Sequence, residues 1–128
     1  MKDILWVSLG AIFGANLRYG ITRLVGRLYP HPFPLGTLII NVTGSFILGV
    51  FFAWAREHME LDPHWRLLIA VGFCGGYTTF SSYAWDSVEL WRQGSPGLFA
   101  LNFLGNNILA LLAVMAGIGL VQMMVPKA

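Results

Sequence analysis

Charged residues are scarce in this sequence. Asp, Glu, Lys and Arg make up 11% of the 128 residues, whereas 56% are hydrophobic. A soluble domain carries roughly 25% charged residues, so this chain lacks the polar cover that water requires. The Lys and Arg residues form no basic cluster, and we therefore expect no nucleic-acid partner.

Cysteine and the usual signs of catalysis are also nearly absent. Cys74 is the only cysteine, which excludes an internal disulfide and says little about the redox compartment. The three histidines fall in predicted loops and show no helical spacing suited to a metal; they are His31, His58 and His64. Because no nucleophile–base pair or phosphate-binding loop is visible, we expect no enzymatic activity.

Long apolar segments are what the sequence does have. The mean hydropathy is +0.66, and about 20 apolar residues suffice to cross a bilayer. We predict an all-α membrane protein with a single domain over residues 1–128 and four spans, at about 4–25, 35–55, 65–91 and 98–125. The short connections are rich in Pro, Gly or charge, so consecutive helices should run antiparallel.

The basic residues are balanced between the two ends of the predicted spans. With the N-terminus on side one, the four on that side are Lys2, Arg56, Arg66 and Lys127, and the four on the other are Arg18, Arg23, Arg27 and Arg92. The positive-inside rule then gives almost no preferred orientation. The balance favours dual topology, with two oppositely oriented copies forming an antiparallel homodimer. Alternatively, another feature fixes one orientation.

Polar residues recur inside two of the predicted spans. Thr37, Asn41 and Ser45 are four residues apart and share a helical face, as do Asn102 and Asn106. Amides are costly in hydrocarbon unless they are hydrogen-bonded or wet. They could join helices by hydrogen bonds or line a path for water or ions. Two such stripes together with a broken helix favour the path.

The stretch GFCGGYTTFSSY at residues 72–83 interrupts the third predicted span. Gly75 and Gly76 predict a helix break at membrane depth, where released carbonyl groups could bind a cation. The pair could instead mark a simple kink or a close crossing of two backbones. Beyond it, Phe80 and Tyr83 share a face, and their positively polarised ring edges could contact an anion.

Other glycines and two charged residues complete the candidate features. Gly10 and Gly14 form a GxxxG pattern that indicates close helix packing. Arg18 lies well inside the first span, where it could extend to the headgroups or mark a pore vestibule. Asp86 lies in the last turns of the third span, where interfacial water could reach it.

The whole chain resembles the Fluc (CrcB-type) fluoride ion channels. The similar segments are GAIFGANLRYG, PLGTLIINVTGSFILG, DPHWRLLIAVGFCGGYTTFSSYAWD and LNFLGNN. The resemblance implies a fluoride-selective channel in the bacterial inner membrane that exports fluoride passively and relieves its toxicity. It implies an antiparallel dual-topology homodimer with two pores, so its partners are fluoride, a second copy and the lipid bilayer. A structural Na⁺ between the copies would be held by the backbone carbonyls of Gly75 and Thr78.

The resemblance also implies a fluoride pathway. Its residues here are Asn41, Phe80, Tyr83, Thr37, Ser81, Asn102 and Asn106, with Arg18 and Asp86 in the vestibule. The chain departs from the family where Tyr83 replaces a phenylalanine and Tyr77 a leucine. Ala110 and Val114 stand where small hydroxyl residues often lie.

Two other classes of function remain as alternatives. A small dual-topology transporter of the multidrug-exporter type would need a carboxylate embedded in the first span, and the only acid there is Asp3 at the terminus. A non-conducting membrane scaffold would use the polar stripes only to join helices. Passive fluoride flux through purified protein in liposomes would separate these functions.

Overall fold

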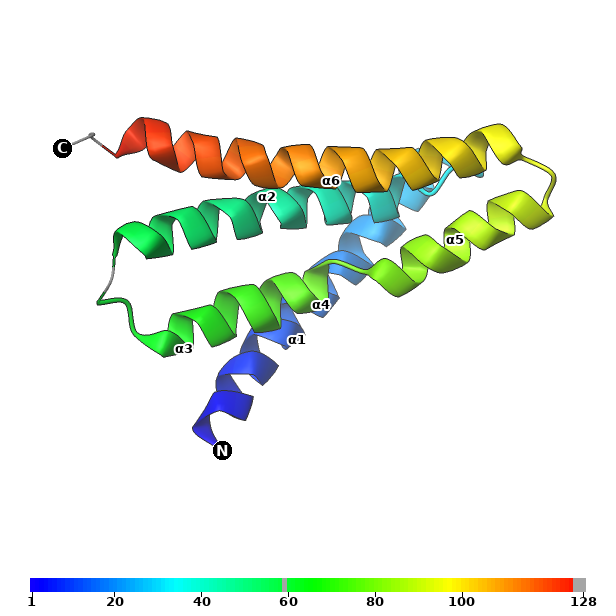
Figure 1. The fold of residues 1–128 in the computed structure, drawn as a ribbon. Helices are drawn as coiled ribbons and strands as arrows, with labels where there is room; N and C mark the ends of the chain where they lie inside the picture. Colours follow the sequence, from blue (N-terminus) through cyan, green and yellow to red (C-terminus); the bar gives the residue numbers. More distant parts are fainter. Residues whose placement is uncertain (59, 126–128) are drawn as a thin grey trace.

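The computed structural model describes residues 1–58 and 60–125, which form helices joined by short loops (Figure 1). Lys127, one of the basic residues in the charge comparison, lies outside the described residues. The elements are α1 (Lys2–Leu28), α2 (Leu35–Glu57), α3 (Pro63–Trp65), the π-helix η1 (Arg66–Cys74), α4 (Gly75–Tyr77), α5 (Phe80–Arg92) and α6 (Pro96–Met124). No strand occurs in the described ranges, so the all-α prediction is confirmed there.

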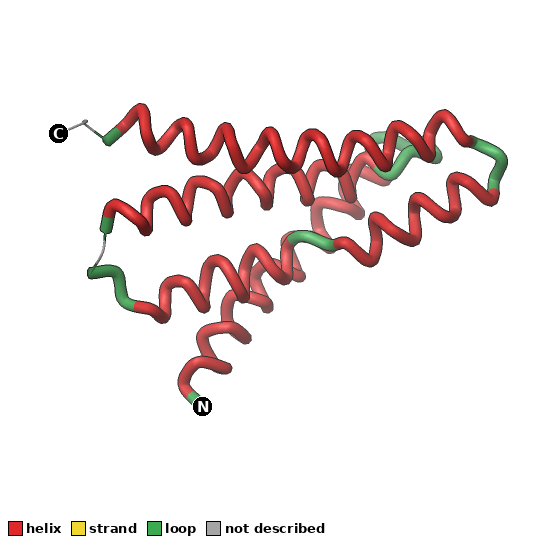
Figure 2. The backbone as a smooth tube through the Cα atoms, viewed as in Figure 1, coloured by secondary structure: helices red, strands yellow, loops and turns green. Residues whose placement is uncertain are grey.

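The helices run up and down between two ends of the molecule. In Figure 2 the chain starts and finishes toward the same end, and the α1–α2 and α5–α6 connections lie at the opposite end. Three helices, α1, α2 and α6, are long and apolar enough to cross a membrane. The third predicted span corresponds to α3 through α5, which follow one another along one path and are interrupted between α4 and α5 (Figures 1 and 2).

The interruption lies later in the sequence than predicted. Gly75 is helical and Gly76 lies within α4, whereas Thr78 and Thr79 are extended, with ψ of 159° and 117°. Helix α5 then begins at Phe80, because the Thr79 hydroxyl oxygen accepts a hydrogen bond from the Ser82 N–H at 3.1 Å and caps the helix. The glycine pair therefore does not break the helix; the two threonines do.

The glycines instead allow α1 to cross closely over the third segment, which comprises α3 through α5. Gly10 and Gly14 of α1 face the backbone of η1, and a Cβ added at Gly10 would meet the Leu68 carbonyl oxygen. On the opposite side of the crossing, a Cβ at Gly72 would lie 2.5 Å from the Val7 oxygen. The GxxxG pattern thus marks close packing, as predicted.

Helices α2 and α6 cross in the same manner. A Cβ at Gly117 would lie 2.6 Å from the Phe46 carbonyl oxygen, and one at Gly49 would meet the Val114 oxygen. The two close crossings pair α1 with η1 and α4, and α2 with α6. They hold the third segment and the α2–α6 pair around the polar residues described below.

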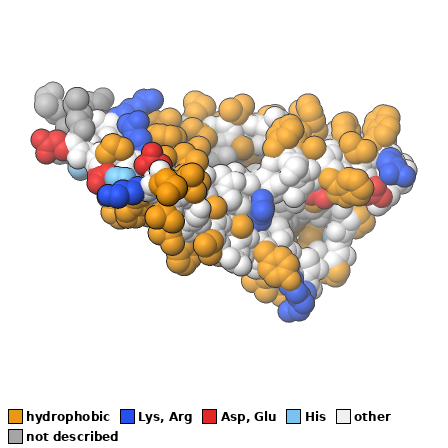
Figure 3. Space-filling model, turned by 90° about the horizontal axis from the view of Figure 1, so that it is seen from below, with side chains coloured by type: hydrophobic (Ala, Val, Ile, Leu, Met, Phe, Trp, Pro, Cys, Tyr) orange, Lys and Arg blue, Asp and Glu red, His pale blue; other side chains and the backbone are white. Residues whose placement is uncertain are grey.

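The outer surface is largely apolar. Hydrophobic side chains cover much of the face in Figure 3, and many large ones are exposed, among them Ile4, Phe13, Leu111 and Met123. Asn102, in contrast, is fully buried. Exposed apolar and buried polar side chains suit a protein whose surroundings are lipid. With three helices able to span a bilayer, the chain is a multi-pass membrane protein.

The sequence predicted His64 in a loop, but the structure places it in a helix. It lies in α3, and its backbone N–H donates to the Asp62 carboxylate at 2.9 Å, which caps this short helix. That bond, supported by the His64 side chain, lowers the pKa of Asp62. His64 Nε2 also lies 3.8 Å from a carboxylate oxygen of Asp3, which connects α3 to the start of α1.

Candidate functional site

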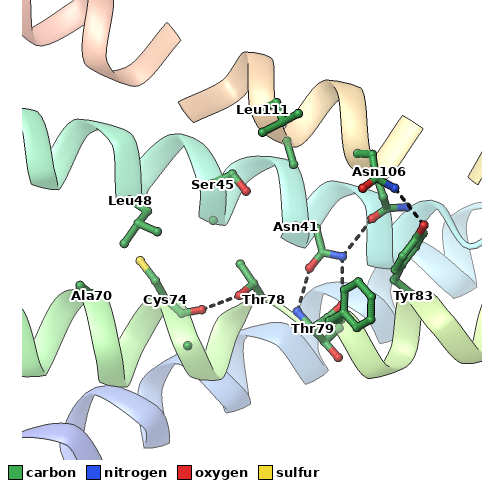
Figure 4. A pocket seen from close by; sticks show the side chains of 15 residues that line it. Asn41, Ser45, Leu48, Ala70, Cys74, Thr78, Thr79, Tyr83, Asn106 and Leu111 are labelled. Atoms are coloured by element: carbon green, nitrogen blue, oxygen red, sulfur yellow. Dashed lines mark hydrogen bonds between the residues drawn. The ribbon is translucent and has the colours of Figure 1, made fainter. Parts of the chain in front are cut away.

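The extended residues between α4 and α5 are held by a side chain of α2. The Oδ1 of Asn41 accepts a hydrogen bond from the Thr79 N–H at 2.8 Å, and its Nδ2 donates to the Thr79 carbonyl at 3.1 Å (Figure 4). In an unbroken α-helix the Thr79 N–H would donate to the Gly75 carbonyl. The Asn41 Oδ1 therefore accepts the hydrogen bond that the Gly75 carbonyl oxygen would accept in an unbroken helix.

A chain of buried hydrogen bonds continues from Asn41 into α6. The Asn41 amide also donates to the Asn106 Oδ1 at 2.9 Å, and the Asn106 amide donates to the carbonyl and the Oδ1 of Asn102 at 3.0 and 2.9 Å. Asn102 in turn donates to the Ser87 hydroxyl at 2.9 Å. These bonds join α2, α5 and α6, so the two predicted polar stripes do connect helices, and their buried amides are satisfied.

A cavity of about 440 Å³ lies beside the helix break. Its wall includes Gly75 and Thr78, the two positions proposed for the cation, together with Asn41 and Asn106. Figure 4 shows side chains from α2, the third segment and α6 around it. A cavity this large can hold several water molecules or a hydrated ion.

Phe80 and Tyr83 both line this cavity, but they are exposed to very different degrees. The Phe80 residue is 77% exposed and Tyr83 only 6%. Their ring centroids are 5.4 Å apart with an interplanar angle of 62°, an edge-to-face arrangement. The Tyr83 hydroxyl oxygen accepts a hydrogen bond from the Asn107 amide at 2.9 Å.

Thr37 and Asp86 do not line the cavity beside the helix break. The Thr37 hydroxyl donates to an Asp86 carboxylate oxygen at 2.9 Å, and both residues line a second cavity of about 190 Å³ near the α1–α2 loop. Thr37 shares a helical face with Asn41 but is one turn nearer the end of the molecule, which explains the separation.

Three predicted residues line neither cavity in the described part of the structure. Arg18 directs a guanidinium nitrogen to the Thr78 carbonyl oxygen at 3.4 Å. Ser81 is exposed, with its hydroxyl 3.3 Å from that of Thr79. Asn102 is enclosed by its hydrogen-bond partners.

Sequence reasoning did not include Thr79 or Asn107 among the site residues. Thr79 had a detectable signal, since threonine is a favoured N-cap residue at the start of a helix. Asn107 adjoins the predicted stripe on α6 but falls outside its spacing. Its partner Tyr83 is 24 residues away, a contact that only the folded chain makes visible.

The fold and the site together define a multi-pass helical membrane protein with a polar cavity at an interrupted helix. A family model described as CrcB-like protein, Camphor Resistance (CrcB), matches residues 5–118. The chain therefore belongs to the CrcB family, as the resemblance in its motifs indicated.

Relatives from several bacteria match the chain over most of its length. A protein of Koribacter versatilis named fluoride-specific ion channel FluC is 53% identical over 122 residues, covering 95% of this chain and 97% of the relative. Proteins of the same name from Shewanella amazonensis and Aquifex aeolicus are 42% and 37% identical, each over 91% of this chain and 94% of the relative. All three names describe ion channels rather than enzymes.

Proposed function

We propose that this protein is a fluoride-selective channel through which fluoride leaves the cell passively, relieving its toxicity. The naming of the relatives as fluoride-specific channels supports this function. The observation that carries it in this chain is the cavity beside the break, where amides, hydroxyls and two aromatic rings come together between membrane-spanning helices.

The composition of the cavity wall suits an anion that must pass without being trapped. Fluoride is small and strongly hydrated, so a pathway must replace its water with close hydrogen-bond donors. The residues described around the cavity include hydroxyls, amides and the Phe80 ring, but no Lys or Arg. A strong fixed cation would slow release of the ion, whereas these neutral groups permit both binding and exit.

An antiparallel homodimer would complete the pathway. Phe80 lines the cavity and yet is 77% exposed, so the wall is open on that side of one copy. A second copy in the opposite orientation would cover it, and the balance of basic residues favours such dual topology. Two cavities related by the twofold axis would give two pores.

The residues at the break fit the proposed structural Na⁺. The Thr79 N–H donates to Asn41 and not to the Gly75 carbonyl oxygen, as it would in a helix. Hard cations prefer oxygen ligands such as this carbonyl. The Thr78 oxygen belongs to an extended residue, and among the described residues it has only the long 3.4 Å contact from Arg18, on one of its two lone pairs. The Gly75 and Thr78 carbonyls of both copies would hold the ion, which when bound would make the local potential favourable for anions.

The exporter alternative requires a carboxylate at the transport site. Asp3 is exposed at the start of α1, and Asp86 is bonded to Thr37 in the second cavity. Neither lines the main cavity of the described structure, which favours a channel for anions over a proton-coupled cation exporter.

Purified protein in liposomes provides the test. Vesicles loaded with potassium fluoride should lose fluoride on addition of a potassium ionophore, whereas vesicles loaded with chloride should retain it. Equal passage of both anions, or no flux of either, would reject the proposal; absence of flux would favour the scaffold alternative. A C-terminal tag found on both faces of the bacterial membrane would support dual topology, and a tag on one face would contradict it.

A further inference from the structure

The amide hydrogens of the central asparagines are already used within the protein. Both hydrogens on the Asn41 amide have acceptors, the Thr79 carbonyl and the Asn106 Oδ1. The Asn106 amide is directed at two oxygens of Asn102. An anion in the cavity could obtain a hydrogen bond from either side chain only by breaking one of these bonds, which has a cost in a low-dielectric interior.

The hydrogen of the Tyr83 hydroxyl, unlike those of the asparagine amides, is left without an acceptor in the described part of the chain, and the reason is the orientation of Asn107. The Asn107 Nδ2 donates at 2.7 Å to the Phe103 carbonyl, which can only accept, so the amide has one possible orientation. The same nitrogen donates to the Tyr83 oxygen at 2.9 Å. Tyr83 is therefore the acceptor in this pair, and its own hydroxyl hydrogen has no acceptor among the residues that the structure describes.

We propose that the Tyr83 hydroxyl is a hydrogen-bond donor to the anion in the main cavity and that Asn107 is the residue that positions it. This inference rests on the proposed function. Tyr83 lines the same cavity as Asn41 and Thr78 (Figure 4). By occupying one side of the phenol oxygen, Asn107 leaves the O–H to point elsewhere, and an anion in the cavity supplies the acceptor that the protein lacks.

Such a donor would favour fluoride over larger halides. Hydrogen bonds from a hydroxyl to an ionised acceptor are short and about twice as strong as neutral ones. The attraction falls with distance, so the smallest halide gains most. One hydrogen bond to a charged group changes an equilibrium constant by roughly tenfold to a hundredfold.

The test compares wild type with Tyr83→Phe, Asn107→Ala and the double variant in fluoride-loaded liposomes. Tyr83→Phe keeps the ring and removes only the hydroxyl, and it should raise the half-saturating fluoride concentration about tenfold. Asn107→Ala should raise it by a smaller factor, and should add nothing to Tyr83→Phe because its action passes through the hydroxyl. Tyr77→Phe is the matched control, since Tyr77 is equally buried, bonds Thr43 at 2.8 Å and does not line the cavity; its half-saturating concentration should stay within twofold of wild type.

The outcomes separate this inference from the proposed function. Wild type without fluoride flux would reject the function itself. Wild type with flux, but with an unchanged half-saturating concentration in Tyr83→Phe, would overturn only the donor role. An equal effect of Asn107→Ala in both backgrounds would show that Asn107 acts independently of Tyr83.

A measurement on unmodified sequence covers the case in which a variant does not fold. Infrared difference spectra of the wild-type protein with isotope-labelled tyrosine should show a shift of the tyrosine C–O band on addition of fluoride, and no shift with chloride. Identical spectra with the two anions would overturn the proposal. A fluoride shift that persists in Tyr77→Phe and is lost in Tyr83→Phe would assign the shift to Tyr83 rather than to the other tyrosines.

Discussion

The side chain of Asn41 pairs with the backbone of Thr79 through two hydrogen bonds, accepting from its N–H and donating to its carbonyl. The amide thus offers one residue the same pair of contacts that a neighbouring β-strand would offer. A buried extended residue needs such partners, because its N–H and carbonyl have left the helical ladder. The pairing accounts for a stable break at Thr79 between helices at membrane depth.

Replacing Asn41 should therefore disturb both the break and conduction. Asn41→Ala removes the partners of the Thr79 peptide and of the Asn106 Oδ1, and each buried group left unpaired costs about 1–3 kcal/mol. We expect at least tenfold slower fluoride efflux from liposomes. Asn16→Ala is the control, because its exposed amide bonds only to the Ile12 carbonyl of its own helix. Similar efflux from the two variants would remove Asn41 from the pathway.

Phe80 should matter for conduction more than for stability. Its exposed ring makes an edge contact with Tyr83, so Phe80→Ile removes a positively polarised ring edge but little buried packing. We expect a large loss of fluoride flux, with a much smaller change in the melting temperature in detergent. Phe13→Ile replaces a similarly exposed phenylalanine, 67% against 77%, on α1 away from the cavity, and its flux should equal that of wild type. Normal flux in Phe80→Ile would contradict the assignment.

The sequence predicted the helices better than it predicted the break. Apolar length and turn residues placed four segments close to their observed bounds, since both signals are local. The glycine pair predicted the interruption a few residues too early, because glycine only permits a bend. The observed break depends on Asn41, 38 residues away from Thr79, and no local pattern reveals that partner.

At the site, too, the sequence predicted local features correctly but not contacts between distant residues. The spacing of Asn102 and Asn106 correctly placed them on one face, and the structure adds that they bond to each other. Spacing placed Thr37 one turn from Asn41, but it could not show that residues of different helices meet each of them. The role of Asp86 as the partner of Thr37 required α2 and α5 to be placed together in space.

Thr78→Ala should preserve the proposed Na⁺ site. The Thr78 hydroxyl already donates to the Cys74 carbonyl at 2.8 Å, so the group left for a cation is the backbone oxygen, which alanine retains. We expect the Na⁺ dependence of fluoride flux, measured against K⁺, to match that of wild type. Thr22→Ala removes a similar bond, from its hydroxyl to the Arg18 carbonyl at 2.9 Å, and is the control for its loss. Loss of Na⁺ dependence in Thr78→Ala alone would indicate ligation through the side chain.

The close crossing of α1 and η1 predicts opposite effects for two glycines of one helix. A Cβ at Gly10 would meet the Leu68 oxygen and lie 2.9 Å from the Gly72 Cα, whereas a Cβ at Gly20 has no neighbour within 4 Å. Gly10→Ala forces the backbones apart and should cost about 1–3 kcal/mol, with a lower Tm in detergent. Gly20→Ala should keep or raise Tm, because alanine is favoured over glycine within a helix by about 0.5–1 kcal/mol. Equal Tm values for the two variants would show that the crossing does not depend on the absent side chain.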